Sequence, residues 1–319
     1  MARVYNRKEG QIEYQTGTTK ILPLSRNYHV LKYYLTITAE IANGASPVYF
    51  DDNLFRLISK VSLVANGSLN LKIIPGEKLV YNSIFDIGRR GKTAINKTAN
   101  GTYIQSQTAE INLIIPNELR PMDTVLFTRN FETYNLEVEF ATAAALGTDI
   151  TVNSATVDVS SQQLIGYSRS KGERINFFKE TARKQKVVSD NNALSISLDV
   201  NQFYTGFLIA VKRDNVLTDA VLKNILVKSG TVVFMDTAAE TIKRINEYDS
   251  KIMNFDENVG LYYLDFTPRG RLSDMLNTVQ SAGGFNTLDL VLDVKNTNSD
   301  TEIAIYPEYV EITSTFEVA

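Results

Sequence analysis

Hydrophobic and polar residues alternate in the clearest segments of the chain. Leu136, Val138 and Phe140 occupy every second position of one such segment, and residues 288–294 repeat the pattern. A period of two is typical of strands that bury one face. Many such short segments with few helical ones indicate β-sandwiches or barrels rather than a parallel α/β sheet.

Three segments carry helical spacing instead. Residues 78–90 and 240–253 place apolar side chains three or four positions apart. Ser273 is a candidate cap for a further short helix holding Leu276 and Val279. We expect these helices to be short connectors within a chain that is mostly strand.

The strand pattern occurs twice. Residues 131–140 align without a gap to residues 285–294, at an offset of 154 positions. Five further pairs follow in the same order along the chain: 35–41 with 194–200, 52–55 with 214–217, 58–64 with 221–227, 113–116 with 265–268, and 157–161 with 310–314. Ordered similarity of this kind predicts two copies of one β-domain. The alternative is a single large sandwich whose strands resemble each other by chance.

One hairpin has a register that can be predicted. Asn66 and Gly67 both tolerate positive φ angles and therefore favour a tight turn. A three-residue loop pairs Ala65 with Leu69 and keeps the alternating apolar residues on one face, whereas a two-residue loop would mix the faces. We therefore expect the longer loop.

The repeat suggests four parts. These are an N-terminal basic arm (1–27), a first β-domain (28–166), a basic linker (167–190) and a second β-domain (191–319). A length of 319 residues is consistent with roughly two domains.

The arm and the linker carry the candidate binding residues. Arg3, Arg7 and Lys8 lie in the arm, which we interpret either as disordered or as reaching a neighbouring subunit or an anionic membrane face. The linker is the most basic stretch of the chain. Its charges form either a solvated face or a contact with an anionic surface such as phospholipid headgroups. The linker candidates are Lys171, Arg174 and Lys179.

Composition narrows the possible functions. A formal net charge of −3 argues against a protein dedicated to binding nucleic acid. The chain has no cysteine and one histidine, His29, which excludes disulfides, thiolate metal sites and multi-histidine metal sites. The first residues include no apolar stretch, so we expect no signal peptide, and no segment is apolar enough for a membrane-spanning helix.

The sequence motifs yield little chemistry. Residues 88–93 end like a phosphate-binding loop, but two residues rather than four separate the first glycine from the Gly-Lys-Thr. Asp51, Asp52 and Asn53 could offer oxygens to a cation, yet the similar Asp214-Asn215 suggests a shared turn. We therefore expect no catalytic residue, no metal and no cofactor.

Two short segments resemble a known family. Residues 54–67, with Asn66-Gly67 at their end, look like the early strand and turn of bacteriophage double jelly-roll major capsid proteins, and so does Pro75-Gly-Glu-Lys-Leu79 after them. The whole chain resembles the family only in architecture. Its size suits the small phage members, such as those of corticoviruses and of the Flavobacterium-infecting lipid-containing phage.

The resemblance implies an all-β fold of two tandem jelly-roll β-sandwiches with a few short helices. It also implies a homotrimer with a pseudo-hexagonal outline, which contacts neighbouring capsid trimers, penton proteins and minor capsid proteins. The phage members enclose an internal lipid membrane. The expected location is the virion shell, after synthesis in the bacterial cytoplasm.

Two other functions remain open at this point. One is a phage receptor-binding or carbohydrate-binding β-sandwich protein. The other is an enzyme, most plausibly a glycoside hydrolase that uses two carboxylates, because their separation is a tertiary property that sequence does not reveal.

Overall fold

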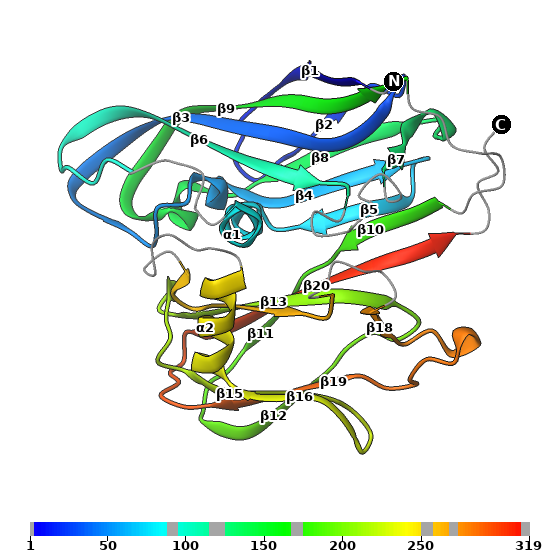
Figure 1. Cartoon of the computed structure of the whole chain (residues 1–319). Helices are drawn as coiled ribbons and strands as arrows, with labels where there is room; N and C mark the ends of the chain where they lie inside the picture. The colour runs from blue at the N-terminus through cyan, green and yellow to red at the C-terminus, as the bar shows by residue number, and fades with distance from the viewer. Residues whose placement is uncertain are drawn as a thin grey trace.

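Two β-sandwiches lie one above the other, with the N-terminal one at the top of Figure 1. The computed structural model describes residues 3–87, 95–114, 125–166, 175–249, 258–267 and 274–313. Helix α1 (Gly76–Ile87) lies between the sandwiches, and α2 (Ala239–Asp249) lies against the C-terminal one. Within these ranges no helix is long and apolar enough to cross a bilayer.

The N-terminal sandwich has one sheet with the strand order β1-β9-β3-β6, where the short β7 also pairs with β3. The facing sheet has the order β2-β8-β4-β5. The strands are β1 (Arg3–Glu13), β2 (Thr19–Pro23), β3 (His29–Tyr49), β4 (Ile58–Ala65), β5 (Leu69–Ile74), β6 (Gly101–Asn112), β7 (Leu126–Phe127), β8 (Tyr134–Phe140) and β9 (Gly147–Ile165). The alternating apolar residues of β3 and β8 meet in one core between the sheets.

The C-terminal sandwich has one sheet with the order β12-β19-β15-β16. In its other sheet, β20 lies between β13 and the pair β10 and β11, while β17 and β18 pair with β13. The strands are β10 (Ile175–Glu180), β11 (Arg183–Lys186), β12 (Asn191–Ser197), β13 (Phe203–Arg213), β14 (Val216–Leu217), β15 (Leu222–Ser229), β16 (Val232–Ala238), β17 (Leu261–Asp265), β18 (Leu276–Asn277), β19 (Asp289–Val294) and β20 (Thr301–Thr313). A second, separate core fills this sandwich.

The two sandwiches have the same topology. If β10 with β11, and β17 with β18, are each taken as one interrupted strand, both sandwiches have eight main strands that pair in the same order. This is the arrangement of a jelly roll. The predicted all-β fold of two tandem jelly rolls is confirmed.

The duplication is also visible strand by strand. The segments 131–140 and 285–294, which align without a gap, contain β8 and β19, and these strands hold the same place in each jelly roll. One alignment is wrong. Residues 35–41 belong to β3, whose topological equivalent is β13, whereas residues 194–200 belong to β12 and the loop after it.

The prediction of a basic N-terminal arm outside the jelly roll is wrong. Residues 3–13 form β1, which pairs antiparallel with β9 from Arg3 opposite Ile165 to Glu13 opposite Thr156. Residues 19–23 form β2 and pair with β8. These two strands complete the first jelly roll, so the arm does not lie outside the duplicated unit.

The predicted basic linker is also wrong over its described part. Residues 175–180 and 183–186 form β10 and β11, and both pair with β20. They are the first strand of the second jelly roll. Strand β10 also runs parallel to β5 of the first jelly roll, so the sheets of the two sandwiches join into one 11-stranded sheet.

Two of the three predicted helices are present. Residues 76–87 form α1 and residues 239–249 form α2. The prediction of a third helix, holding Leu276 and Val279, is wrong. Leu276 lies in β18, and residues 280–282 form one turn of 3-10 helix. Ser273, its proposed cap, lies outside the described residues.

The three-residue hairpin loop is confirmed, since Ala65 pairs with Leu69. A β-bulge follows between Leu63 and Val64, which places Lys72 rather than Leu71 opposite Leu63. The hairpin therefore begins in the predicted register and leaves it after two pairs.

Candidate functional site

The contact between the two jelly rolls is the most distinctive site in the described structure. Its apolar part forms where α1 packs on the sheet of the second jelly roll that contains β13 and β20. Tyr81 and Ile84 of α1 are fully buried against Leu208 of β13 and Tyr306 of β20. Leu79 and Val80 of the same helix pack into the first core. Helix α1 thus packs both into the core of the first jelly roll and into a separate apolar cluster at the contact.

A buried group of charges lies beside this apolar contact. We call it the Glu180 cluster, and it consists of Lys72 (β5), Lys78 (α1), Glu180 (β10), Glu308 (β20) and Tyr263 (β17). The Nζ atoms of Lys72 and Lys78 each lie 3.0 Å from a different carboxylate oxygen of Glu180.

The same cluster continues into the second jelly roll. Lys78 Nζ also lies 2.9 Å from an oxygen of Glu308, and the Tyr263 hydroxyl donates to the other oxygen over 3.0 Å. Both lysine side chains are fully buried. Two ammonium groups and two carboxylates therefore balance in charge, and each ion is held by hydrogen bonds inside the protein.

The environments of these ions shift their pKa values in different directions. Burial alone would raise the pKa of Glu180, but the two neighbouring ammonium groups outweigh burial and lower it. Burial lowers the pKa of Lys72, which pairs with one carboxylate. Lys78 is equally buried, yet its two carboxylates more than compensate and its pKa is raised. Lys78 is therefore the central cation of the cluster.

A second cluster surrounds Glu77, the neighbour of Lys78 on α1. One oxygen of Glu77 accepts from Lys212 of β13 and lies 3.8 Å from Arg56. The other lies 3.3 Å from Nζ of Lys184 on β11 and 3.3 Å from the Tyr306 hydroxyl. Glu77 thus joins α1 to three strands of the second jelly roll.

The Glu77 cluster holds its central carboxylate ionised. Burial would raise the pKa of Glu77, but Lys212, Lys184 and Arg56 together lower it to about 2. Arg56 completes the contact. Its Nη1 lies 3.4 Å from Asp51 and 3.5 Å from the Asn215 carbonyl oxygen of the second jelly roll.

These clusters fix geometry more than they add stability. Removing two opposite charges from water costs nearly as much as their attraction returns, so a buried ion pair is often no more stable than an apolar one. A misplaced partner, however, leaves an uncompensated buried charge, which is strongly unfavourable. The clusters therefore favour one arrangement of the two jelly rolls over all others.

The start of α1 determines where Glu77 and Lys78 point. A Cβ atom on Gly76 would lie 2.3 Å from the Phe55 carbonyl oxygen, so only glycine allows this close approach. The Asn53 side chain donates to the Glu77 carbonyl oxygen over 3.2 Å. These contacts place the two charged residues at the first turn, facing the second jelly roll.

The sequence analysis missed both clusters, although one signal was present. The segment Pro75-Gly-Glu-Lys-Leu79 carried part of the family resemblance, and it contains both Glu77 and Lys78. Lys212 and Glu308 carry no such signal. Lys212 stands beside Arg213 at the end of an apolar run, and Glu308 is a single charge between Pro307 and Tyr309, so both look like ordinary solvent-facing residues.

Of the six predicted basic residues, the four that the structure describes lie in two separate places. Arg3, Arg7 and Lys8 lie together on β1, at the outer edge of the first jelly roll, where Lys8 pairs with Asp158 over 3.4 Å. Lys179 lies on β10, between the two jelly rolls. Lys171 and Arg174 lie outside the described residues.

The described residues show no constellation for metal binding. No group of three or more His, Cys, Asp or Glu side chains among them is placed to hold a metal ion. His29 begins β3 and packs its ring 4.1 Å from that of Phe127. The acidic turn at Asp51 and Asp52 forms ion pairs with Arg56 and Lys97.

Comparison with known proteins defines the fold. No protein-family model matches the chain, and no curated protein sequence is significantly similar to it. Among solved structures, the major capsid protein of Sulfolobus turreted icosahedral virus is similar over 96% of each chain, with a TM-score of 0.75 and 14% identity.

Two other solved structures extend this likeness. The major capsid protein of bacteriophage PM2 has a TM-score of 0.64 and 13% identity, over 99% of this chain and 100% of the other. The Faustovirus major capsid protein has a TM-score of 0.60 and 8% identity, over 98% and 90%. At these identities the likeness establishes the fold, and the chain has the double jelly-roll fold of viral major capsid proteins.

Proposed function

We propose that this protein is a major capsid protein, a structural subunit of an icosahedral viral shell without catalytic activity. The observation that carries the proposal is the buried contact between two jelly rolls of equal topology, in a chain that is similar to a viral capsid protein over 96% of its length. The buried clusters at the contact support a role that needs one fixed shape. Shell subunits need such a shape because small errors accumulate over many copies.

The proposed assembly unit is a homotrimer. Three chains with two jelly rolls each present six similar walls, which gives a pseudo-hexagonal outline that tiles a curved lattice. A head-to-tail contact between unlike jelly rolls closes into a ring when its rotation is one third of a turn. The proposed partners are neighbouring trimers, penton proteins and minor capsid proteins, and no sequence-specific nucleic acid.

The shell would surround an internal lipid membrane, after synthesis in the bacterial cytoplasm. The exposed Arg3 and the neighbouring Arg7 and Lys8 support a contact with anionic headgroups, because they extend along one sheet edge. Lys171, Arg174 and Lys179 remain candidates for the same contact.

Electron microscopy of the purified full-length protein tests the capsid proposal. Class averages with hexagonal trimers, or closed shells, are the expected result. Compact monomers that bind host-surface glycans saturably would overturn it and favour the receptor-binding or carbohydrate-binding alternative.

A further inference from the structure

A group of polar side chains lies between the two sheets of the first jelly roll. Tyr33 of β3 and Tyr134 of β8 come from opposite sheets, and their ring centroids are 6.2 Å apart. Ser161 of β9 is the strand partner of Tyr33, and Gln163 lies two residues further along β9. At most 2% of the surface of each of these four residues is exposed. Together with Glu9 of β1 and Ser25, which follows β2, we call them the Glu9 group.

A β-bulge brings the carboxylate of Glu9 into this group. The pairing of β1 with β9 shifts its register at Glu9, which is the extra residue. A bulge redirects side chains, and bulges are frequent beside functional sites. The Glu9 carboxylate accepts hydrogen bonds from the Ser161 hydroxyl over 2.5 Å, from the Gln163 amide over 2.9 Å and from the Ser25 backbone N–H over 3.0 Å. Glu9 therefore ties the edge strand β1 to β9 and to the segment after β2.

Four buried polar atoms of the group have no hydrogen-bond partner in the described structure. They are the Oε1 atom of Gln163 and the hydroxyl oxygens of Ser25, Tyr33 and Tyr134. The nitrogen of the Gln163 amide is occupied, because it donates to Glu9. The unpartnered oxygen of that amide can accept a hydrogen bond but cannot donate one.

The unpartnered atoms belong to one site. Burial is the main cause that raises the pKa of Tyr33 and of Tyr134, and the nearby Glu9 carboxylate raises both pKa values further. The two tyrosines also shift each other's pKa. Ser25 is held at the same place, since its N–H donates to Glu9 and the N–H of Leu24 donates to the Tyr134 carbonyl oxygen over 2.9 Å.

We infer that the Glu9 group binds internal water between the sheets of the first jelly roll. A buried polar atom without a partner is strongly unfavourable, and internal water typically makes about three hydrogen bonds to such atoms. Four unpartnered atoms correspond to about one or two water molecules. The water would connect the network of Glu9 to the buried tyrosine pair, and so link the edge strand β1 to both sheets.

Hydrogen-bond chemistry favours water over a cation at this site. Three of the four atoms are hydroxyl oxygens, and each hydroxyl carries a hydrogen that needs an acceptor. A cation would use the lone pairs of these oxygens and offer nothing to their hydrogens. A water molecule both donates and accepts, so it can satisfy the hydroxyl groups and the amide oxygen of Gln163 together. This inference goes beyond the proposed function and does not depend on it.

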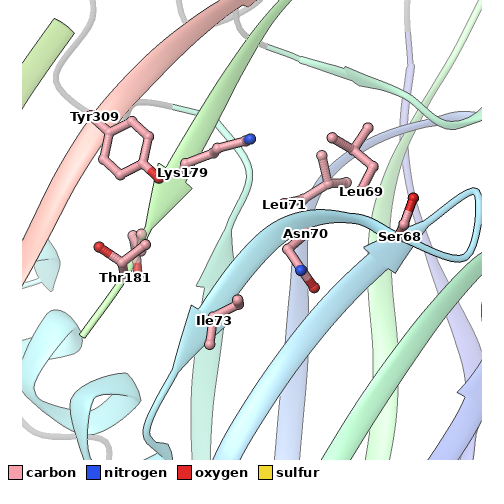
Figure 2. A pocket seen from close by; sticks show the side chains of 9 residues that line it. Ser68, Leu69, Asn70, Leu71, Ile73, Lys179, Thr181 and Tyr309 are labelled. Atoms are coloured by element: carbon pink, nitrogen blue, oxygen red, sulfur yellow. The ribbon is translucent and has the colours of Figure 1, made fainter. Parts of the chain in front are cut away.

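The first test counts long-lived internal water in the full-length protein by magnetic relaxation dispersion. The variant Ser25→Ala/Tyr33→Phe/Tyr134→Phe removes three hydroxyls and keeps every group that donates to Glu9. We expect it to hold about one or two fewer long-lived waters than wild type. Tyr309→Phe is the matched control, because Tyr309 lines a pocket of about 300 Å³ beside the exposed Asn70 (Figure 2), where water exchanges freely.

The second test uses the direction of a stability change. In a hydrated site the Tyr134 hydroxyl holds water, so Tyr134→Phe should raise the equilibrium constant of unfolding in urea by roughly fivefold. In a dry core the same substitution would remove an unpartnered hydroxyl and lower that constant. This single variant also keeps the inference testable if the triple variant does not fold.

Three results would overturn the inference. One is equal long-lived water in the triple variant and in wild type. Another is Tyr134→Phe that unfolds no more readily than wild type. The third comes from terbium, a luminescent cation that tyrosine sensitises in this tryptophan-free chain. Terbium luminescence that is present in wild type and lost in the triple variant would assign the site to a cation instead of water.

Discussion

Lys72 and Glu180 are paired both through their backbones and through their side chains at the contact between the two jelly rolls. Their Cα atoms are partners in the parallel bridge between β5 and β10, and their side chains form a fully buried ion pair of 3.0 Å. Backbone pairing and charge pairing therefore select the same register. A slip of one residue would move Lys72 to the other face of its strand and leave both charges buried without compensation.

Removing the central carboxylate should be costly. In Glu180→Gln, the ammonium groups of Lys72 and Lys78 lose their shared negative partner while remaining buried. We expect the free energy of unfolding, measured in urea, to fall by about 3–5 kcal/mol. The matched control is Glu139→Gln, which breaks an exposed 3.1 Å pair with Lys60 and should cost less than about 1 kcal/mol. Equal losses in the two variants would contradict a special role for the cluster.

Removing both members of one pair should cost less than removing Glu180 alone. In Lys72→Met/Glu180→Met, Lys78 keeps its 2.9 Å partner Glu308, and apolar side chains replace the pair. A double-mutant cycle should give a coupling energy of about 1–3 kcal/mol. Strictly additive effects of the two substitutions would mean that the pair does not act as a unit.

The Glu77 cluster predicts a pH dependence on the acid side. The pKa of Glu77 is lowered from 4.5 to about 2 in the folded protein. A lowered folded-state pKa adds stability that is present above the unfolded value and is lost as pH falls toward the folded value. The shift corresponds to roughly 3 kcal/mol, lost between about pH 5 and pH 2.

The matching measurement is the unfolding free energy of wild type and Glu77→Gln from pH 7 to pH 2. The variant should be less stable at neutral pH and should show a flatter curve in the acid range. Parallel curves for the two proteins would show that Glu77 does not cause the acid dependence.

Residues 3–13 should behave as part of the fold. Their deletion removes the buried Ile12 and exposes the edge of β9, so we expect a loss of at least about 2 kcal/mol and a tendency to aggregate. Arg3→Gln/Arg7→Gln changes charge but keeps the strand, and should shift stability by less than about 0.5 kcal/mol. An unchanged melting temperature of the deletion variant would contradict this prediction and show that the segment does not stabilise the fold.

The basic segments predict a salt-dependent membrane contact. Arg3→Glu/Arg7→Glu and Lys171→Glu/Arg174→Glu should each weaken co-sedimentation with anionic vesicles. The difference should shrink at high salt, since exposed charges are screened within about 8 Å at physiological ionic strength. Lys186→Glu/Lys223→Glu, which reverses two exposed lysines of the second jelly roll, serves as a charge-matched control. Binding that is unaffected by all three changes would identify these residues as ordinary surface charges.

The duplicated strands could be predicted because each buries one face and so keeps strict alternation. β8 and β19 show this best, and they align at the correct topological position. The first strands of both jelly rolls were missed for a physical reason. β1 is an edge strand on which Ile12 is the one fully buried hydrophobic residue, so its sequence looks like a polar arm.

The buried charges at the contact between the jelly rolls could not be predicted from the sequence, for a different reason. Lys72 and Glu308 are each flanked by apolar residues, as any surface position of a strand would be. Their burial follows from packing one jelly roll on the other, which brings residues 230 positions apart, Lys78 and Glu308, within 2.9 Å. No local pattern records such a distance.

The two jelly rolls differ in height. β3 and β9 have 21 and 19 residues, while their equivalents β13 and β20 have 11 and 13. At about 3.3 Å per residue, β3 is roughly 30 Å longer than β13. In the proposed trimer, tall and short jelly rolls would alternate around the ring. The outline would be hexagonal, but the heights of the six jelly rolls would have only threefold symmetry. Neighbouring trimers on a lattice would then distinguish two orientations, sixty degrees apart, that a flat hexagon leaves equivalent.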